Sequence, residues 1–465
     1  MLFNSLDFVL LFAVVLAVYR VLDRKAQNYL LLVVSYVFYG WWNWHYLALI
    51  FVAAVVDFTA GRGIARAATP HGRRRWLVCS IVFNLGILCY FKYLDFFLRS
   101  AVDALQLVGL EVHAPTLHVL LPIGISFFIF QSMSYIIDVY RGAAKATDSL
   151  PDYLLFVSFF PQLAAGPIER ANHLLGQFQR DRTITPDGVY SGLLLILWGL
   201  FKKVAIADNL GVYVDVVYNN YAQHSGSSLL LATYLFAFQI YCDFSGYSDM
   251  AAGLARLLGI DMMTNFRAPY FSESVQEFWR RWHISLSTWF RDYVYIPLGG
   301  SRGTGLRVAV SLMVVFLVSG LWHGANWTFL VWDGLHGAYL VGQRLFGRAR
   351  TPATGWRRLA RILVTFHLVC LAWIFFRAPT VTAAISIIVS IAANHGAVFL
   401  HPKIVDGLVC LGLLLVLEAV MEPRTFDRWL VQRPSLAHLV VATGVLFGVI
   451  LLGQQQGAQF IYFQF

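Results

Sequence analysis

Two histidines of this sequence have the residue type and the surroundings that proton-transfer chemistry needs. His323 lies in the apolar stretch LVSGLWHGANWTFLVWDG (317–334), and His283 lies in RRWHISLSTW (280–289). An ionisable side chain at membrane depth is costly, so it is usually kept for chemistry or transport. A neutral imidazole, with an ordinary pKa of about 6.5, can take a proton from a hydroxyl group near neutral pH. Both residues are therefore candidates for a general base in acyl transfer.

A purely structural role is the alternative for each histidine. In a bundle of membrane helices, His323 could hydrogen-bond to a neighbouring helix and do nothing else. His283 could lie on a solvated helix face at the level of the lipid headgroups. Residue type alone leaves both alternatives open.

Further polar side chains accompany the histidines and a second apolar stretch, FQIYCDFSGYSDMAAG (238–253). Such groups could orient an acceptor or hydrogen-bond a thioester carbonyl, which lowers the barrier to transfer. The carboxylates could instead hold helices together or bind an ion in transport. The candidate donor- and substrate-binding residues are Arg280, Arg281, Trp282, Arg291, Trp322, Asn326, Asp333, Gln239, Asp243, Ser245 and Asp249.

The arginines of this set suggest what the donor is. Guanidinium groups bind phosphate through two parallel hydrogen bonds, which suits an acyl carrier such as coenzyme A. The alternative is that Arg280, Arg281, Arg291 and Arg302 fix the membrane topology and contact headgroups.

Several other chemistries lack their signatures in the sequence. The five cysteines form no CxxC pair, so neither a disulfide framework nor a zinc site is predicted. There is no HExxH or Walker loop, which are the marks of zinc proteases and nucleotide-driven pumps. We predict neither a metal nor a permanently bound cofactor.

Composition identifies a membrane protein. The 465 residues are 58% hydrophobic and 13% charged, about half the charge of a soluble domain. The net charge of +10 comes from short basic clusters between apolar runs, such as GRGIARAATPHGRRRW (61–76). Such clusters are typical of cytoplasmic loops. Membrane lipids are therefore expected partners and nucleic acid is not.

Apolar stretches of suitable length for a bilayer recur along the whole chain. We predict an all-α polytopic protein with about eleven transmembrane helices plus re-entrant and interfacial helices. The stretches lie near 6–22, 27–42, 44–58, 76–98, 116–139, 188–206, 228–258, 307–322, 326–345, 359–377, 404–420 and 436–452.

Lysine and arginine placement orients these spans. Basic loops at 62–75, 344–361 and 424–433 are predicted to be cytoplasmic, which puts both termini outside. The first span has its positive charge after the apolar stretch, so we expect a retained span and not a signal peptide. One membrane domain is predicted over 1–465, with N-terminal spans at 1–115, a catalytic core at about 116–345 and C-terminal spans at 346–465.

Two segments depart from simple spans. LPDYLLFVSFFPQLAAGPIER (150–170) contains proline and glycine, so it is predicted to be re-entrant or in-plane and buried in protein. The alternative is a kinked ordinary span. In 274–302, aromatic residues recur at helical spacing opposite a polar face that includes Arg280, His283 and Arg291. That pattern predicts an amphipathic helix at the membrane surface, ending at Pro297.

Five motifs together resemble the membrane-bound O-acyltransferase (MBOAT) family, in the branch of the bacterial alginate O-acetyltransferase. They occur in family order and cover most of 120–340. The motifs are FFPQLAAGPIER, QIYCDFSGYSDMAAGLARLLGI, FRAPYFSESVQEFWRRWHISLSTWFRDYVYIPLGGSR, SGLWHGANWTFLVWDGLHG and the C-terminal FIYFQF.

The resemblance implies roles for both histidines. His323 in LWHG matches the essential histidine of the family, and His283 in RRWHISLSTW matches the second active-site histidine of the bacterial branch. The family fold is a ring of tilted helices around a thin centre with a funnel on each side. By this resemblance, His323 lies at membrane depth so that a cytoplasmic donor and an outside acceptor can meet there.

The resemblance also implies a function and partners. Members of this branch take acetyl from cytoplasmic acetyl-CoA and pass it across the bacterial inner membrane. A separate periplasmic acetyltransferase of the SGNH type then places it on a polysaccharide. Acceptors in the branch include alginate, cellulose, other exopolysaccharides and peptidoglycan, and a related branch carries D-alanine to teichoic acid. The residues of this chain do not choose among them.

Two other functions compete with O-acetyl transfer. A polysaccharide or lipid transporter without covalent chemistry would use Asp243 and Asp249 as coupling sites. Such a transporter often has inverted repeats with paired broken helices, and the sequence has none. The other possibility is a scaffold that anchors a periplasmic enzyme, in which case replacing His323 would have no effect on acyl transfer.

Overall fold

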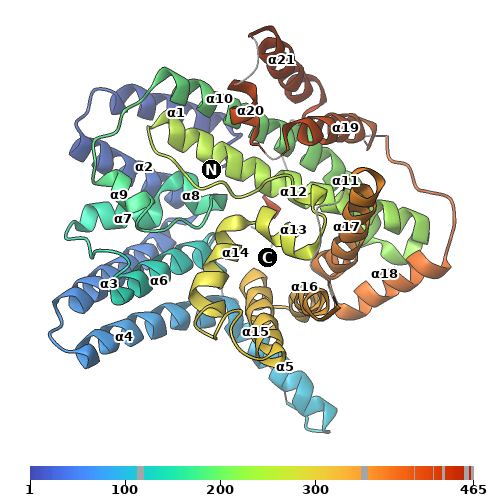
Figure 1. Ribbon diagram of the computed structural model, residues 1–465, viewed down its shortest axis with the longest axis horizontal. Coiled ribbons are helices and arrows are strands. Elements are labelled where there is room, and N and C mark those ends of the chain that lie inside the picture. Colours follow the sequence, from blue (N-terminus) through green and yellow to red (C-terminus); the bar gives the residue numbers. More distant parts are fainter. Residues whose placement is uncertain are drawn as a thin grey trace. The chain divides into compact units, whose positions relative to one another are not determined.

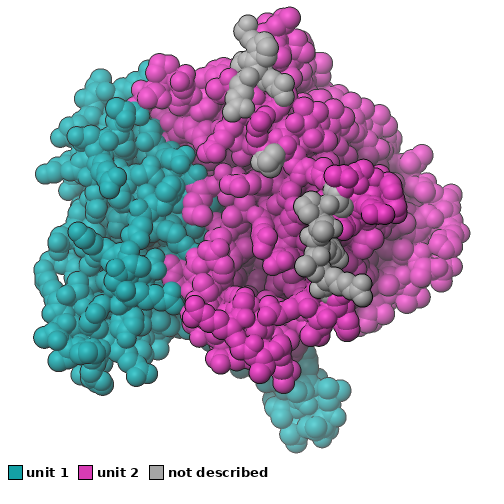
Figure 2. All heavy atoms as spheres, in the orientation of Figure 1, with its two compact units in different colours: residues 1–183, 258–262 teal, residues 184–257, 263–465 magenta. Residues whose placement is uncertain are grey.

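The computed structural model describes residues 1–112, 120–346, 354–402, 404–422, 424–431, 435–454 and 460–461. All regular structure in these residues is helical, as predicted. The chain divides into two compact units (Figure 2): unit 1 comprises 1–183 with 258–262, and unit 2 comprises 184–257 with 263–465. The boundary between the two units falls near residue 183. The single membrane domain stays a prediction.

Unit 1 consists of helices from the first 183 residues (Figure 1). Asn43 has an extended backbone and separates two 20-residue helices, each about 30 Å long and sufficient to cross a bilayer. The helices are α1 (Leu6–Tyr19), α2 (Arg24–Asn43), α3 (Leu47–Arg66), α4 (Pro70–Leu88), α5 (Leu94–Leu107), α6 (Ile125–Arg141), α7 (Leu150–Ser158), α8 (Phe160–Ala165) and α9 (Leu174–Phe178).

The segment predicted to be re-entrant is two short helices with a break at Phe159. Helix α7 has 9 residues and α8 has 6, so neither is long enough to cross a bilayer. The break is buried inside unit 1, where the Phe160 amide donates to Ser35 Oγ of α2 at 3.1 Å. A buried partner of this kind is what broken backbone at membrane depth requires.

Unit 2 contains the remaining helices (Figure 1), and the FIYFQF motif lies in the described residues only at 460–461. The longest helix, α12, has 32 residues. The helices are α10 (Pro186–Leu200), α11 (Asp208–Asn219), α12 (Gly226–Leu257), α13 (Val275–Arg281), α14 (Ile284–Phe290), α15 (Gly305–His323), α16 (Trp327–Phe346), α17 (Gly355–Arg377), α18 (Val381–Ala393), α19 (Ile404–Met421), α20 (Phe426–Val431) and α21 (Ser435–Leu452).

Glycines allow α10 and α12 to pack closely. A Cβ atom on Gly199 would lie 2.5 Å from the Gly246 carbonyl oxygen, and one on Gly253 would lie 2.6 Å from the Gly192 carbonyl oxygen. Small residues at such crossings let membrane helices approach backbone to backbone. The contact fixes α12, which carries several of the candidate polar residues.

The predicted apolar stretches all contain a helix in the described residues. Within the described part of the chain, seven helical stretches are long and apolar enough to cross a membrane, and shorter apolar helices accompany them. The first of the seven, Arg24–Arg66, includes both α2 and α3. Helix α18 was not predicted, because its 13 residues are fewer than the roughly 17 that a span needs.

Candidate active site

His323 is the last residue of α15, and after three intervening residues the chain turns back as α16. Asn326 fixes this turn: its Oδ1 accepts from the Thr328 amide at 3.0 Å, and its Nδ2 donates to the Pro379 carbonyl at 3.3 Å. A Cβ atom on Gly320 would lie 2.6 Å from the Phe329 carbonyl oxygen, so the two helices meet closely just before the turn. The sequence prediction of a helical pair around His323 is therefore confirmed.

His283 does not lie on the polar face of a continuous surface helix, and that prediction was wrong. The segment breaks between α13 and α14, and His283 occupies the break with φ of 42° and ψ of 54°. Its side chain is fully buried. A left-handed backbone at a non-glycine residue is costly and persists only where the surroundings hold it.

Asn265 and Arg267, from the chain before α13, hold this break in place. The Asn265 carbonyl accepts from the Ile284 amide at 2.9 Å, and the Arg267 amide donates to the Arg281 carbonyl at 2.9 Å. Asn265 Oδ1 also accepts from Ser285 Oγ at 3.0 Å, and its Nδ2 donates to Ser248 of α12 at 3.2 Å. These bonds satisfy backbone groups that a continuous helix would have paired internally.

The break brings the two histidines together. Their ring centroids are 6.4 Å apart, and the Trp322 ring lies 5.7 Å from His283 and 4.9 Å from His323. Phe244 of α12 contacts His283 at 4.7 Å. Three of the predicted site residues therefore share one location inside unit 2, although 40 residues separate the histidines in sequence.

Aromatic rings surround His323, which is 3% exposed. The Trp332 ring meets it edge to face at 4.8 Å, and Phe376 of α17 lies at 6.0 Å. Trp332 in turn stacks on Trp373 at 5.2 Å. Such a wall excludes water and strengthens any electrostatic interaction with a reacting group.

Burial determines the charge of His283. It lowers the pKa of the imidazole from 6.5 to about 3, because the charged form loses its hydration. His283 is therefore neutral at physiological pH. A neutral imidazole can accept a proton from a hydroxyl group or hydrogen-bond to a substrate.

Asp333 and His336 form a polar layer next to the histidine pair. Asp333 is fully buried and faces Ser319 of α15. His336 Nδ1 accepts from Trp279 Nε1 at 3.3 Å, which fixes the Trp279 indole. This bond gives His336 a structural role.

A cavity of about 520 Å³ lies between α13, α14, α15 and α16. Trp279, Ser319 and the exposed Arg280 and Arg291 are among the residues that line it. A second cavity of about 410 Å³ shares Gln276 and Arg280 with the first and adds Arg267. We call the two together the arginine-lined cavities. Their size and charge fit an elongated ligand with anionic groups.

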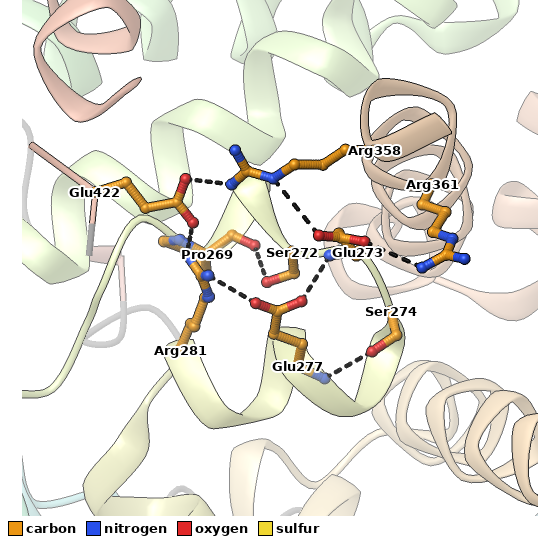
Figure 3. A network of polar contacts seen from close by, with 9 residues as sticks. All are labelled: Pro269, Ser272, Glu273, Ser274, Glu277, Arg281, Arg358, Arg361 and Glu422. Atoms are coloured by element: carbon orange, nitrogen blue, oxygen red, sulfur yellow. Dashed lines mark hydrogen bonds and ion pairs between the residues drawn. The ribbon is translucent and has the colours of Figure 1, made fainter. Parts of the chain in front are cut away.

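Arg281 has a different environment from Arg280 (Figure 3). Its guanidinium pairs with Glu277 at 2.6 Å and with Glu422, at the end of α19, at 2.7 Å. Glu422 also pairs with Arg358 of α17 at 2.5 Å. Glu273 joins the group through Arg358 and Arg361 at 3.5 and 3.3 Å. Together these ion pairs join three segments, and we call the six residues the ion-pair network.

The candidates on α12 lie in another part of unit 2. Asp243 pairs with Lys203 at 2.7 Å and accepts from the Ile461 amide at 2.7 Å. Lys202 contacts Asp249 at 2.6 Å and Ser245 at 2.9 Å. Gln239 lies against α11, where a Cβ on Gly211 would be 2.9 Å from its Nε2. None of these four residues has a ring or hydrogen-bond contact with the histidine pair among the described residues.

Sequence reasoning missed the two lysines and Asn265. Lys202 and Lys203 lie in an apolar stretch, LILWGLFKKVAIA (195–207), and the rule that singled out His323 applies to them equally. Both are buried within helical backbone. Asn265 gives no such signal, because nothing in its neighbours distinguishes a loop asparagine that pins a helix break.

Comparisons with known proteins place this site in a family. The model of the MBOAT, membrane-bound O-acyltransferase family, matches residues 141–378. The chain is 43% identical over 386 residues to the probable alginate O-acetylase AlgI of Azotobacter vinelandii, covering 83% of this chain and 76% of that protein.

More distant relatives match as well. The peptidoglycan O-acetyltransferase of Helicobacter pylori is 35% identical over 82% of this chain and 78% of its own length. The teichoic acid D-alanyltransferase of Bacillus subtilis is 28% identical over 57% of this chain and 71% of its own length. The matched region of the family model includes both histidines.

Proposed function

This chain is a member of the membrane-bound O-acyltransferase family, and we propose that it takes acetyl from cytoplasmic acetyl-CoA and passes it across the bacterial inner membrane to O-acetylate a cell-surface polysaccharide. The observation that carries the proposal is the pair of buried histidines, 6.4 Å apart, at the junction of α13–α14 with α15–α16. His323 is the general base, and His283 is its neutral partner that hydrogen-bonds or orients a substrate.

The donor enters through the arginine-lined cavities. The exposed guanidinium groups of Arg280, Arg291 and Arg267 bind the phosphates of coenzyme A. The thioester arm extends along the wall formed by Trp279 and Ser319 toward His323. Ser319 supports this path, because it lines the larger cavity and lies one helical turn before His323.

The chemistry is direct acyl transfer. His323 Nδ1 or Nε2 takes the proton of the acceptor hydroxyl as its oxygen attacks the carbonyl carbon. The carbon–sulfur bond then breaks, and the leaving thiolate takes that proton to give coenzyme A. General-base help of this kind contributes about 10²–10⁴ in rate.

Acceptor choice follows the names of the relatives. Alginate O-acetylases match at 42–43% identity and a peptidoglycan O-acetyltransferase matches at 35%. We propose an alginate-like exopolysaccharide, cellulose or a similar glycan as acceptor, with peptidoglycan as the alternative. The final transfer to this glycan is made by a separate periplasmic acetyltransferase of the SGNH type, which receives the acetyl group from this chain.

Transport without chemistry has less support. The carboxylates that would serve as coupling sites, Asp243 and Asp249, are paired with Lys203 and Lys202 at 2.7 and 2.6 Å. Breaking a buried ion pair is strongly unfavourable, so these pairs are better suited to holding α12 against η3 (Phe201–Ala207) than to exchanging ions.

The test is turnover of labelled acetyl-CoA by the purified protein in nanodiscs. We expect His323→Ala to abolish acetyl transfer and His283→Ala to reduce it about 10²-fold or more. Exposed His367, whose Nδ1 contacts the Leu363 carbonyl at 2.7 Å, provides the control: His367→Ala should retain activity. Full activity of folded His323→Ala would refute the proposed base. No use of acetyl-CoA by the wild type, with partner and glycan present, would refute the proposed donor.

A further inference from the structure

The indole N–H of Trp332 is a buried hydrogen-bond donor that has no acceptor in the described part of the chain. Trp332 is fully buried, and its Nε1 has no acceptor among the residues that the structure describes. Leaving a buried donor unpaired is destabilising, and such groups in native proteins call for an explanation. A catalytic role is one recognised explanation.

Two neighbouring tryptophans do have an acceptor for the indole N–H. Trp373, which stacks on Trp332, donates its Nε1 proton to Tyr270 Oη at 3.2 Å. Trp279 donates to His336 at 3.3 Å. Trp282 also lacks an acceptor in the described part of the chain, but its ring packs on Phe266 and Trp373 at 5.0 and 5.1 Å. Trp332 and Trp322 both have a ring contact with His323, at 4.8 and 4.9 Å, and Trp332 in addition packs on Trp373 and Phe376.

Packing prevents the Trp332 ring from turning to find another partner. Trp373 covers one face at 5.2 Å and 18°, Phe376 meets it at 4.9 Å and 74°, and His336 at 5.4 Å and 77°. The N–H group is therefore held in one direction before any substrate binds. A donor that is already oriented, in a site without water, is the arrangement that stabilises developing negative charge most effectively.

The position of Trp332 suits the acyl carbonyl. Its ring centroid lies 4.8 Å from that of His323, at 89°. A carbonyl group in contact with the base is therefore within reach of the indole edge. We propose that Trp332 is a further catalytic residue, whose indole N–H donates a hydrogen bond to the carbonyl oxygen of the thioester as that oxygen becomes negative. This inference rests on the proposed acetyl transfer with His323 as base.

The acceptor oxygen forms a bond to the carbonyl carbon, its proton passes to His323, and the π electrons of the carbonyl move onto the oxygen. Trp332 stabilises this oxyanion without giving up its proton. The carbonyl re-forms as the carbon–sulfur bond breaks, and the thiolate takes the proton from the His323 imidazolium.

Trp332→Phe is the direct test, because it retains an aromatic ring and removes the N–H. We expect kcat for acetyl transfer to fall about 10²-fold, the usual loss for one oxyanion donor, with little change in KM for acetyl-CoA. The matched control is Trp198→Phe, the same substitution at a buried tryptophan of α10 that stacks on Phe426 at 4.4 Å, and it should keep most of the wild-type kcat. Unchanged kcat in folded Trp332→Phe would overturn the inference.

Two further measurements separate catalysis from packing. Replacing Trp332 by benzothienylalanine, in which sulfur takes the place of N–H in a ring of the same shape, should reduce kcat as much as Trp332→Phe. The dithioester analogue of acetyl-CoA presents a C=S group, which is a weaker hydrogen-bond acceptor. The preference of the wild type for acetyl-CoA over the dithioester should shrink in Trp332→Phe. An unchanged preference, or an active benzothienylalanine protein, would show that Trp332 only fills space.

These results are distinguishable from failure of the proposed function. If Trp332→Phe is fully active while His323→Ala is inactive, the oxyanion role is wrong and the acetyl transfer stands. If the wild type does not turn over acetyl-CoA at all, both proposals fail together.

Discussion

Burial of His283 makes the stability of the protein depend on pH. Its pKa is about 3 in the folded protein and about 6.5 when unfolded, so the unfolded state binds the additional proton between these values. Above pH 6.5 the neutral His283 does not reduce the free energy of unfolding. As the pH falls from 6.5 toward 3, protonation of His283 in the unfolded state lowers that free energy. We expect the wild type to lose about 2 kcal/mol between pH 7.5 and pH 5 through His283. Thermal unfolding in nanodiscs across this range measures the effect.

The control for this prediction is His283→Gln, which cannot be protonated. Its stability should be lower at pH 7.5 but should change less between pH 7.5 and pH 5 than that of the wild type. Equal slopes for the two proteins would mean that His283 is solvated when folded, contrary to its burial.

Sequence identified the residues of the histidine site better than their surroundings. His323 and His283 were found from their residue type and from motifs, and Trp322 from its position beside His323. The sequence pattern put His283 on a solvated face because helical periodicity assumes that the helix continues. The actual break depends on Asn265, 18 residues away, and periodicity cannot report a hydrogen bond of that range.

Variants of His283, at the break between α13 and α14, can distinguish the effect of backbone strain on stability from the effect of the imidazole on activity. His283 has φ of 42°, a conformation that glycine adopts freely and alanine does not. We expect His283→Gly to be more stable than His283→Ala by about 1 kcal/mol, while both lose acetyl transfer. Thermal unfolding and acetyl-CoA turnover on the same preparations measure the two effects.

A matched pair of variants at an ordinary helical position gives the reference. Thr288 lies inside α14, where glycine should be less stable than alanine by about 1 kcal/mol. The order of stability at His283 should therefore be the reverse of the order at Thr288. The same order at both positions would mean that the helix is continuous through His283.

The ion-pair network should matter more than exposed ion pairs. Glu422 has 11% of its side chain exposed and holds Arg281 and Arg358, so Glu422→Ala leaves two guanidinium groups without it. We expect a loss of about 1–3 kcal/mol, since partly buried charges are costly to leave unpaired. Asp95, 38% exposed and paired with Arg99 at 2.9 Å, is the control. Asp95→Ala should cost about 0–1 kcal/mol, and equal losses would contradict the structural role of the network.

Much of the helical layout was predictable, because length and apolar composition alone define membrane spans. The predicted stretches correspond to helices, and the broken segment at 150–170 was found from Pro161, Gly166 and Pro167. What the sequence could not predict is which carboxylates meet which cations. From sequence, Asp243 and Asp249 were candidates for ion coupling. In the structure they form ion pairs with Lys203 and Lys202.

Unit 2 brings the two predicted sides of the membrane close to the histidine pair. Arg281 belongs to the ion-pair network, which joins basic loops predicted to be cytoplasmic. It is two residues from His283 in sequence, which corresponds to at most roughly 7 Å of chain. On the other side, Asn326 is three residues from His323 and contacts Pro379. Nearby Arg377, at the end of α17 that the sequence predicts to be outside, pairs with Asp215 of α11 at 2.7 Å. A donor and an acceptor could thus reach one centre from opposite sides.

This arrangement requires that the two ends of α17 face opposite compartments. Trp356, 75% exposed beside the basic loop, should be cytoplasmic, and exposed Gln223, which follows α11, should be outside. In a variant without the exposed Cys79 and Cys89, an impermeant maleimide should label Gln223→Cys in intact spheroplasts and Trp356→Cys only after permeabilisation. Acetyl transfer by both variants confirms that they are folded. Labelling of Trp356→Cys from outside would put the arginine-lined cavities on the side that lacks acetyl-CoA, and the proposed donor path would be excluded.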